Sequence, residues 1–313
     1  MEHEFEKRSV YRFGGKGNDW CFVYLPEGYD PNRARPYPFV ICNHGNGWTM
    51  DGSAKTANWT KRTMYVPMDD PDYLAAPMQY NGTNDAALWY SNPTVEAFLT
   101  AGYVVCGCQN HGDCLYGNRD CRDACVAFYH HMVENYHVTA QCAMIGASNG
   151  AMTTLNASAV LGEKVRAIIL QYPLTCLKNQ YYGYPEHQTA IRKAHNISDE
   201  AISEADFIKA TDGFDTMYTN MEDGVKKGYF PPAMILWSST DAVTKGSINA
   251  LPLYEMLKRS GKTVKIRQVD TDGKIRGHGD YAHFAPEEYV AWIEEHFWNH
   301  SFHKNRHPYA SYY

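Results

Sequence analysis

A lone serine, Ser148, stands between two glycines in the stretch IGASNG at residues 145–150. The spacing G-x-S-x-G is typical of a sharp strand-to-helix turn that exposes a serine hydroxyl at the edge of a sheet. The apolar run CAMI precedes it and the helix-like run AMTTLNASAVLG follows it, so the context fits. The pattern favours Ser148 as a nucleophile. The alternative is a glycine-rich turn whose serine only caps the helix.

A serine hydroxyl attacks well near neutral pH only if a base removes its proton, and an acid must orient that base. Asp241 ends the apolar run AMILWSSTD, which in a parallel sheet places it at the same edge as Ser148. Asp270, at the end of the last apolar run, is the competing acid. An aspartate after a strand can also serve only as a helix cap.

Two histidines compete for the role of base in GKIRGHGDYAHFAPEE, between the last predicted strand and the last predicted helix. His278 has a glycine on each side, which frees the loop around it. His283 is closer to the helix and could instead pack against its first turn. We favour His278, because a general base needs a loop that helix packing does not hold. His283 is the alternative base.

A turn with two glycines, NHGNGW, follows the apolar run PFVIC. It is similar to H-G-x-G turns whose backbone N–H groups face a nucleophile and stabilise an oxyanion. The candidate oxyanion donors are the backbone N–H groups of Gly45, Asn46, Gly47 and Asn149. The alternative for NHGNGW is an ordinary turn after a strand. His44 and His111 are expected to hold loops in place; contact with substrate is the alternative for His111.

Short apolar runs alternate with helix-length amphipathic stretches, which is the pattern of a mostly parallel sheet with helices on both faces. The predicted strands are residues 38–45, 103–112, 142–146, 166–174, 233–241 and 264–270. An earlier run, DWCFVYLPEGY, predicts an antiparallel edge strand or hairpin arm that ends at Pro26. Supporting helices are predicted over residues 91–102, 248–261 and 285–298.

Two stretches, residues 49–90 and 176–230, far exceed the roughly two to six residues usual between strand and helix in such folds. We expect one domain over residues 1–313, with both stretches inserted above the carboxyl edge of the sheet as a lid or pocket wall. The second stretch is rich in tyrosine and contains NISDEAISEADFIKA, which predicts a capped helix.

The composition, 44% apolar and 14% aromatic, predicts a folded protein. A net charge of -6 provides no basic surface for nucleic acid. No apolar stretch approaches the roughly 18 residues of a membrane span, and the start MEHEFEKRSVYRF has no secretory apolar core. We therefore expect no nucleic acid partner, no membrane association and a cytoplasmic location.

The nine cysteines fit reduced thiols better than a disulfide framework in a chain of 313 residues. Those crowded together are Cys106, Cys108, Cys114, Cys121 and Cys125. Their spacings lack the repeated C-x2-C pair of a strong zinc motif, and Cys106 and Cys108 fall inside a predicted strand. We expect neither a metal nor an organic cofactor.

Five motifs in order, NHGNG, AGYVVCGCQNHG, GASNG, WSSTD and GHGDYAHF, resemble the landmarks of the α/β-hydrolase superfamily. The order serine, acid, histidine is also that of the superfamily, and the resemblance covers about Trp20 to Phe297. It implies a three-layer α/β sandwich with a mostly parallel sheet of about eight strands. The insertion at residues 49–90 and the second late histidine depart from the usual pattern.

The resemblance also implies a triad and an oxyanion hole. The implied triad is Ser148, Asp241 and His278, with Asn149 and the Asn46 region as the oxyanion hole. A serine nucleophile disfavours two other activities of this fold, haloalkane dehalogenase and epoxide hydrolase, and favours acyl chemistry. The leading expectation is a carboxylesterase that cleaves a small or medium ester through an acyl-enzyme.

Three other functions remain open. A peptidase or amidase of the same fold would need an amine-binding carboxylate pair, for which only MDDPD at residues 68–72 or MEDG at residues 221–224 is at hand. An acyltransferase and a non-catalytic binding protein are the others. An aromatic or sugar-bearing ester would suit the tyrosines of the insertions, which are Tyr80, Tyr90, Tyr181, Tyr182 and Tyr184.

Overall fold

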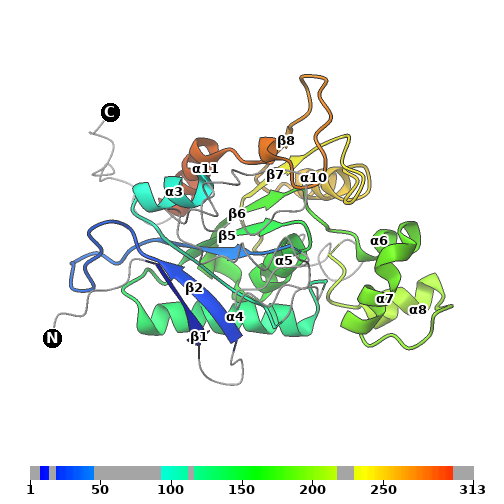
Figure 1. Ribbon diagram of the computed structural model, residues 1–313, viewed down its shortest axis with the longest axis horizontal. Helices are drawn as coiled ribbons and strands as arrows, with labels where there is room; N and C mark the ends of the chain where they lie inside the picture. Colours follow the sequence, from blue (N-terminus) through cyan, green and yellow to red (C-terminus); the bar gives the residue numbers. More distant parts are fainter. Residues whose placement is uncertain (1–7, 14–18, 46–92, 112–115, 217–228, 299–313) are drawn as a thin grey trace, which may run out of the picture.

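The computed structural model describes residues 8–13, 19–45, 93–111, 116–216 and 229–298. They form an eight-stranded sheet with the strand order β1-β2-β4-β3-β5-β6-β7-β8 (Figure 1). The strands are β1 (Arg8–Phe13), β2 (Asp19–Tyr24), β3 (Phe39–Asn43), β4 (Val104–Cys108), β5 (Cys142–Ala147), β6 (Val165–Gln171), β7 (Ala233–Trp237) and β8 (Val264–Gln268). All six strands predicted for the parallel part of the sheet are confirmed.

From β4 to β8 every neighbouring pair of strands is parallel. Strand β2 runs antiparallel to both β1 and β4, so the run DWCFVY is a hairpin arm next to the edge strand β1. The mostly parallel sheet expected from the sequence is therefore confirmed. Because the six central strands point the same way, the loops at their carboxyl ends meet along one edge.

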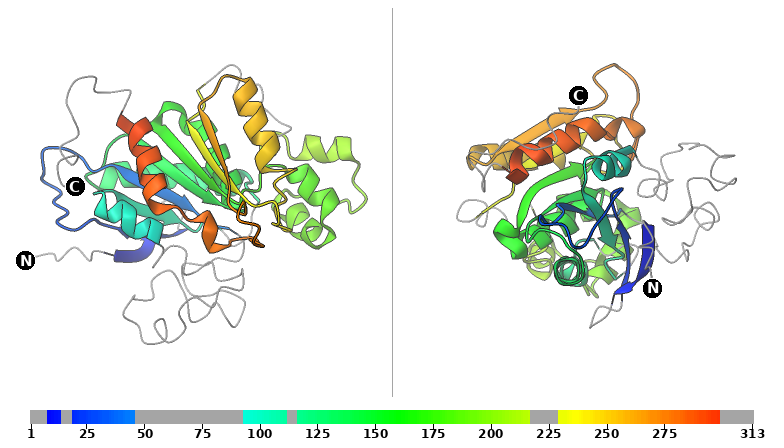
Figure 2. Two further views of the ribbon diagram at one scale, coloured as in Figure 1. Left: turned by 90° about the horizontal axis from the view of Figure 1, so that it is seen from above. Right: turned by 90° about the vertical axis from the view of Figure 1, so that its left-hand side faces the viewer.

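Helices cover both faces of this sheet (Figure 2). They are α3 (Pro93–Thr100), α4 (Arg119–Asn135), α5 (Gly150–Leu161), α10 (Ala250–Arg259) and α11 (Pro286–Trp298). Helices α3 and α11 pack together over one face, and α4 and α5 pack together over the other, where α10 shares their apolar core. This is the expected three-layer sandwich. Helix α4 fills a stretch for which the sequence analysis predicted no helix.

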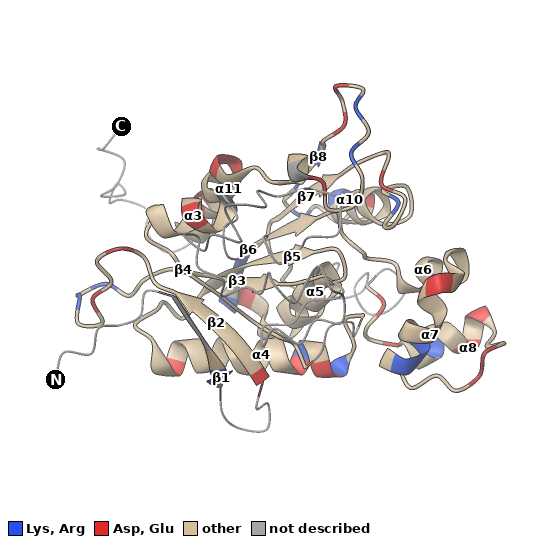
Figure 3. Cartoon of the chain, viewed as in Figure 1, with Lys and Arg blue, Asp and Glu red and all other residues tan. Residues whose placement is uncertain are grey.

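The core follows the two-residue period of the strands. In β3, Phe39 and Ile41 point into the layer that holds α4 and α5, whereas Val40 and Cys42 point into the layer that holds α3 and α11. Strands β3, β4, β5 and β7 contain no charged residue, and Figure 3 shows the charges on helices, loops and the remaining strands. Strands buried on both faces explain the continuous apolar runs in the sequence.

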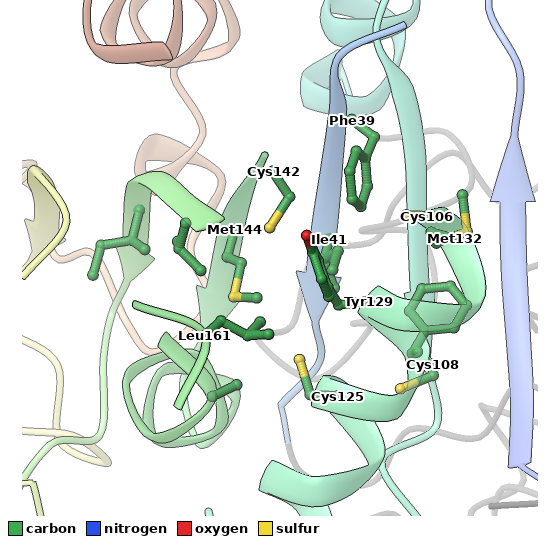
Figure 4. Close-up of a cluster of buried hydrophobic side chains, with 14 of the residues drawn as sticks. Phe39, Ile41, Cys106, Cys108, Cys125, Tyr129, Met132, Cys142, Met144 and Leu161 are labelled. Atoms are coloured by element: carbon green, nitrogen blue, oxygen red, sulfur yellow. The ribbon is translucent and has the colours of Figure 1, made fainter. Parts of the chain in front are cut away.

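Most of the crowded cysteines belong to this core (Figure 4). Cys106, Cys125 and Cys142 lie among apolar side chains such as Ile41 and Tyr129, and all the cysteines that the structure describes are buried and unpaired. Burial raises the pKa of Cys106 and Cys142 well above the usual thiol value. These thiols are therefore protonated and serve as small apolar packing groups.

Three helices follow β6 and lie beyond the carboxyl ends of the central strands (Figure 1). They are α6 (Leu177–Gly183), α7 (Pro185–Ala194) and α8 (Glu204–Ala210). The predicted capped helix begins only at Glu204, where Ser203 accepts a hydrogen bond from the backbone of Asp206. The other insertion, residues 49–90, lies outside the described residues. No helix in the described part of the chain is both long enough and apolar enough to cross a membrane.

Candidate active site

The turn between β5 and α5 holds Ser148 with φ at 54°, a left-handed backbone that residues with a Cβ rarely adopt. The glycines on either side are a steric necessity. A Cβ on Gly146 would lie 2.5 Å from Thr154 Oγ1, and one on Gly150 would lie 2.2 Å from Asn43 O. Both distances are shorter than any real contact of a Cβ atom. The crossing of β3, β5 and α5 therefore requires G-x-S-x-G and leaves the serine half-buried at the sheet edge.

Backbone hydrogen bonds hold this unusual turn in place. Ser148 N donates to Gln171 O at 2.9 Å, and Ser148 O accepts from Ala151 N at 3.1 Å and from Leu174 N at 2.9 Å. The partners come from the end of β6, the start of α5 and the loop after β6. Surroundings that fix a strained residue in this way are common at functional sites.

Three predicted residues form a continuous chain of hydrogen bonds. Ser148 Oγ lies 2.8 Å from His278 Nε2, and His278 Nδ1 lies 2.9 Å from Asp241 Oδ2. The serine follows β5, the aspartate follows β7 and the histidine follows β8, so the common carboxyl edge of the parallel strands brings them together. His278 is partly exposed, whereas Asp241 is 3% exposed.

Asp241 is held as an ionised carboxylate. Burial would raise its pKa, but the hydrogen bond from His278 and those from the backbone of Thr244 and Val243 outweigh burial, so the pKa lies below its usual value. Oδ1 accepts the N–H of Val243 at 2.8 Å and that of Thr244 at 3.0 Å. A charged acceptor beside Nδ1 fixes the histidine tautomer that leaves Nε2 free to accept a proton from Ser148.

Thr244 also touches this chain, which the sequence analysis did not anticipate. Its hydroxyl oxygen lies 2.9 Å from Tyr172 O, 3.0 Å from Asp241 Oδ2 and 3.2 Å from His278 Nδ1. The Tyr172 ring packs edge-on against the His278 ring, with centroids 4.8 Å apart. The position three residues after a candidate acid, in DAVT, is the sequence signal that would have pointed to Thr244.

The competing acid and base lie elsewhere. Asp270 Oδ2 accepts from Ser238, Ser239 and Thr240, so it ties the loop after β7 to the end of β8. These bonds outweigh burial and lower the pKa of Asp270. His283 is fully buried, its Nδ1 lies 2.9 Å from Asp280 O, and burial lowers its pKa to about 4. The structure thus places His278, and not His283, against Ser148.

The loop after β3 passes beside the serine. A Cβ on Gly45 would lie 3.2 Å from Ser148 Cβ and 3.9 Å from its Oγ. The two ring nitrogens of His44 lie 2.7 Å from Gly45 O and 2.8 Å from Gln109 O, so His44 ties this loop to the loop after β4. Asn149 directly follows the serine and is buried at the start of α5. Asn46 and Gly47 lie outside the described residues.

His111 holds its loop through its backbone. Its N–H donates to Asp19 Oδ2 at 3.0 Å, while the residue as a whole is exposed. In the second insertion, the Tyr181 ring packs against Phe207 at 4.6 Å. The Tyr182 ring lies 5.7 Å from Phe207, so these two tyrosines stabilise the helical insertion itself.

Several other predicted features cannot be placed. The carboxylate pairs at residues 68–72 and 221–224, as well as Tyr80 and Tyr90, lie outside the described residues. Among the residues that the structure does describe, no three His, Cys, Asp or Glu side chains gather in a way that could hold a metal ion.

Comparison with known proteins yields matches in structure only. No protein-family model and no curated protein sequence matches this chain. A puromycin hydrolase structure is similar at a TM-score of 0.63 and 14% identity, over 93% of this chain and 39% of that one. Carboxyl esterase 2 from the mycorrhizal fungus Tuber melanosporum is similar at 0.56 and 15%, over 93% and 85%. An S-formylglutathione hydrolase from Agrobacterium tumefaciens is similar at 0.58 and 12%, over 92% and 94%.

The chain has the α/β-hydrolase fold, as the resemblance in its sequence implied. It spans about two fifths of the length of the puromycin hydrolase, but most of the length of the other two proteins. All three of these proteins are named as hydrolases or esterases. Identities of this size show the fold alone, so the reaction must be argued from the site.

Proposed function

We propose that this protein is a serine hydrolase that cleaves small or medium carboxylic esters through an acyl-enzyme. The observation that carries the proposal is the chain from Ser148 Oγ through His278 to the Asp241 carboxylate, with distances of 2.8 Å and 2.9 Å. A hydroxyl, an imidazole and a buried carboxylate in this order are the parts that nucleophilic acyl transfer needs.

In the first half-reaction, His278 Nε2 takes the proton of Ser148 Oγ as that oxygen bonds to the ester carbon. The carbonyl oxygen becomes an oxyanion, which the backbone N–H of Asn149 and the loop after β3 would stabilise. Collapse of the tetrahedral intermediate breaks the bond to the alkoxy oxygen, which leaves as an alcohol with the proton from His278. Asp241 stabilises the imidazolium that exists between these two proton transfers.

In the second half-reaction, water repeats the same steps. His278 takes a proton from the water as it attacks the acyl-enzyme, and then returns a proton to Ser148 Oγ as the acid departs. The cycle consumes one ester and one water and forms one alcohol and one acid. It needs no metal and no organic cofactor, because every proton and bonding electron pair comes from the chain, the ester or the water.

The neighbours that this chain matches nearly end to end favour an ester over an amide. It spans 85% of the fungal carboxyl esterase and 94% of the S-formylglutathione hydrolase, against 39% of the puromycin hydrolase. We also propose that α6 to α8 form one wall of the substrate pocket, because they lie beyond the strand ends that carry the site (Figure 2).

The test is covalent labelling by a fluorophosphonate, followed by turnover of chromogenic substrates. We expect one label per chain in the wild type and none in Ser148→Ala, and hydrolysis of p-nitrophenyl acetate but not of aminoacyl anilides. A wild type that resists both the label and the esters would point to a binding protein. Faster cleavage of the anilides would make the protein a peptidase, and new esters formed with added alcohols would make it an acyltransferase.

A further inference from the structure

A second histidine, His187, lies on α7, within the helical insertion that follows β6. It is half-buried, and its Nδ1 lies 2.8 Å from the hydroxyl oxygen of Tyr116. Within the described part of the chain, no hydrogen-bond partner contacts the other ring nitrogen, Nε2. The ring is thus held by one nitrogen, while the other remains available to a ligand.

Tyr116 is a fixed support for that ring. It is 2% exposed and has φ at 46°, and its carbonyl oxygen lies 3.1 Å from His195 Nε2. The next residue, Gly117, lies so close to α5 that a Cβ there would be 2.5 Å from Met152 Cβ. Because α5 begins directly after Ser148, the Tyr116 hydroxyl has a defined position relative to the nucleophile.

Helix α6, which directly precedes the helix of His187, is also fixed to the loop that carries Asp241. Gln180 Nε2, on α6, donates to Val243 O at 3.2 Å. The Tyr184 ring lies 5.5 Å from Lys245 Nζ and 5.9 Å from the His187 ring. His187 is therefore linked by a series of contacts to both the nucleophile turn and the acid loop.

The electrostatic surroundings keep His187 neutral near pH 7. Burial lowers the pKa of His187 most, Glu186 opposes this, and the nearby His278 lowers the pKa further. A neutral imidazole carries a hydrogen on only one ring nitrogen, and the Tyr116 hydroxyl can donate to the other. In the tautomer in which Tyr116 donates to Nδ1, Nε2 carries the hydrogen.

We propose that His187 is a substrate-binding residue that donates its Nε2–H to an oxygen acceptor in the alcohol portion of the ester. The inference rests on the proposed function, in which His278 protonates the departing alkoxy oxygen, so that the alcohol portion lies on the His278 side of Ser148. His187 lies near His278, and Tyr184 connects it to the loop that carries Asp241. The favoured substrates are esters of alcohols that carry a second ether or hydroxyl oxygen close to the ester, as glycols and sugars do.

Two acetate esters of nearly equal size test this. In 2-methoxyethyl acetate an ether oxygen replaces one methylene of n-butyl acetate. Both esters form the same acetyl-enzyme, so the ratio of their kcat/KM values reports only on acylation and on contacts with the alcohol. We expect His187→Leu to lower the methoxyethyl-to-butyl ratio by about threefold to tenfold, which is the range of one neutral hydrogen bond.

Three further variants separate binding from general damage. Tyr116→Phe removes only the hydroxyl that orients the ring, and it should lower the ratio by less than His187→Leu does. His187→Gln retains an N–H near the place of Nε2 and should restore part of the ratio. Thr189→Leu, at an exposed position on the same helix, is the matched control and should leave the ratio at its wild-type value.

The outcomes also separate this inference from the proposed function. Equal ratios in the wild type and in His187→Leu would overturn the role of His187 while leaving the esterase intact. If the wild type hydrolyses neither acetate nor p-nitrophenyl acetate, the proposed function itself is wrong.

Discussion

The connection between β8 and α11 contains two histidines in opposite environments. His278 stands between two glycines, is partly exposed and contacts both Ser148 and Asp241. His283 is fully buried in a short 3-10 turn before α11, and burial lowers its pKa to about 4. The surroundings of a histidine thus determine whether it contacts the Ser148 hydroxyl or packs in the interior, and five residues of chain are enough to separate the two.

The same contrast holds for the two acids at the strand ends. Asp241 presents one carboxylate oxygen to His278 and the other to the backbone of its own loop. Asp270 Oδ2 accepts hydrogen bonds from the hydroxyl groups of Ser238 and Ser239 and from the backbone N–H of Thr240. One acid contacts the His278 ring, while the other stabilises the loop from which the first one projects.

Replacing each histidine in turn should show the difference between them most clearly. His278→Ala removes the proposed base, and we expect kcat/KM for p-nitrophenyl acetate to fall by about 10⁴-fold or more. His283→Asn retains a donor near the place of Nδ1 and should cost less than about tenfold. Steady-state kinetics, with circular dichroism to verify folding, measures both. If the two losses are similar in correctly folded proteins, the assignment of the base is wrong.

Replacing each acid should give the next largest difference. Asp241→Asn keeps the shape but loses the charge that fixes the histidine tautomer, and we expect a drop in kcat of about 10³- to 10⁴-fold. Asp270→Asn should instead lower the free energy of unfolding by about 1–3 kcal/mol, since hydroxyl groups lose a charged acceptor. Urea denaturation measures stability alongside kinetics. A catalytic loss in Asp270→Asn as large as that in Asp241→Asn would argue against the distinction.

The buried histidine predicts a pH dependence of stability. The pKa of His283 is about 4 in the folded state and 6.5 ordinarily, so unfolding takes up a proton between these values. Its contribution is fully present above pH 6.5 and is lost as the pH falls towards 4. Between pH 7 and pH 5 this loss is on the order of 2 kcal/mol.

Urea denaturation of His283→Asn at pH 7 and pH 5 isolates the contribution of His283 to the free energy of unfolding. The variant should be less stable at pH 7, and its stability should fall less steeply towards pH 5 than that of the wild type. Parallel pH profiles would show that His283 does not titrate in this window.

The smallest effect concerns Thr244, whose hydroxyl contacts Asp241 and His278. Thr244→Val removes the hydroxyl at nearly constant volume, and we expect kcat/KM to fall by about threefold to tenfold because the imidazole loses one positioning contact. Thr244→Ser should recover most of the activity. A change in thermal stability without a change in the pH profile of kcat/KM would make Thr244 a packing residue only.

The sequence predicted the sheet and the nucleophile turn well, because both depend on local patterns. Strands buried on both faces need continuous apolar runs, and the crossing at Gly146 and Gly150 excludes any Cβ, so glycines must appear at these positions. Helices α4, α6 and α7 were missed. Helix α4 does have a buried stripe at helical spacing, but several of its members are cysteine, alanine or tyrosine, which are only weakly apolar. Helices α6 and α7 are only 7 and 10 residues long, so tertiary packing supplies much of their stability.

By itself, the sequence determined the α/β architecture, the serine in its turn and a short set of candidate acids and bases. Only the tertiary structure decided among them, placing Asp241 and His278 within hydrogen-bonding distance while directing Asp270 and His283 to packing. It also brought the Thr244 hydroxyl into contact with both Asp241 and His278. The physical reason is that the chain pattern fixes which edge of the sheet a residue reaches, whereas contacts between separate loops fix which atoms meet there.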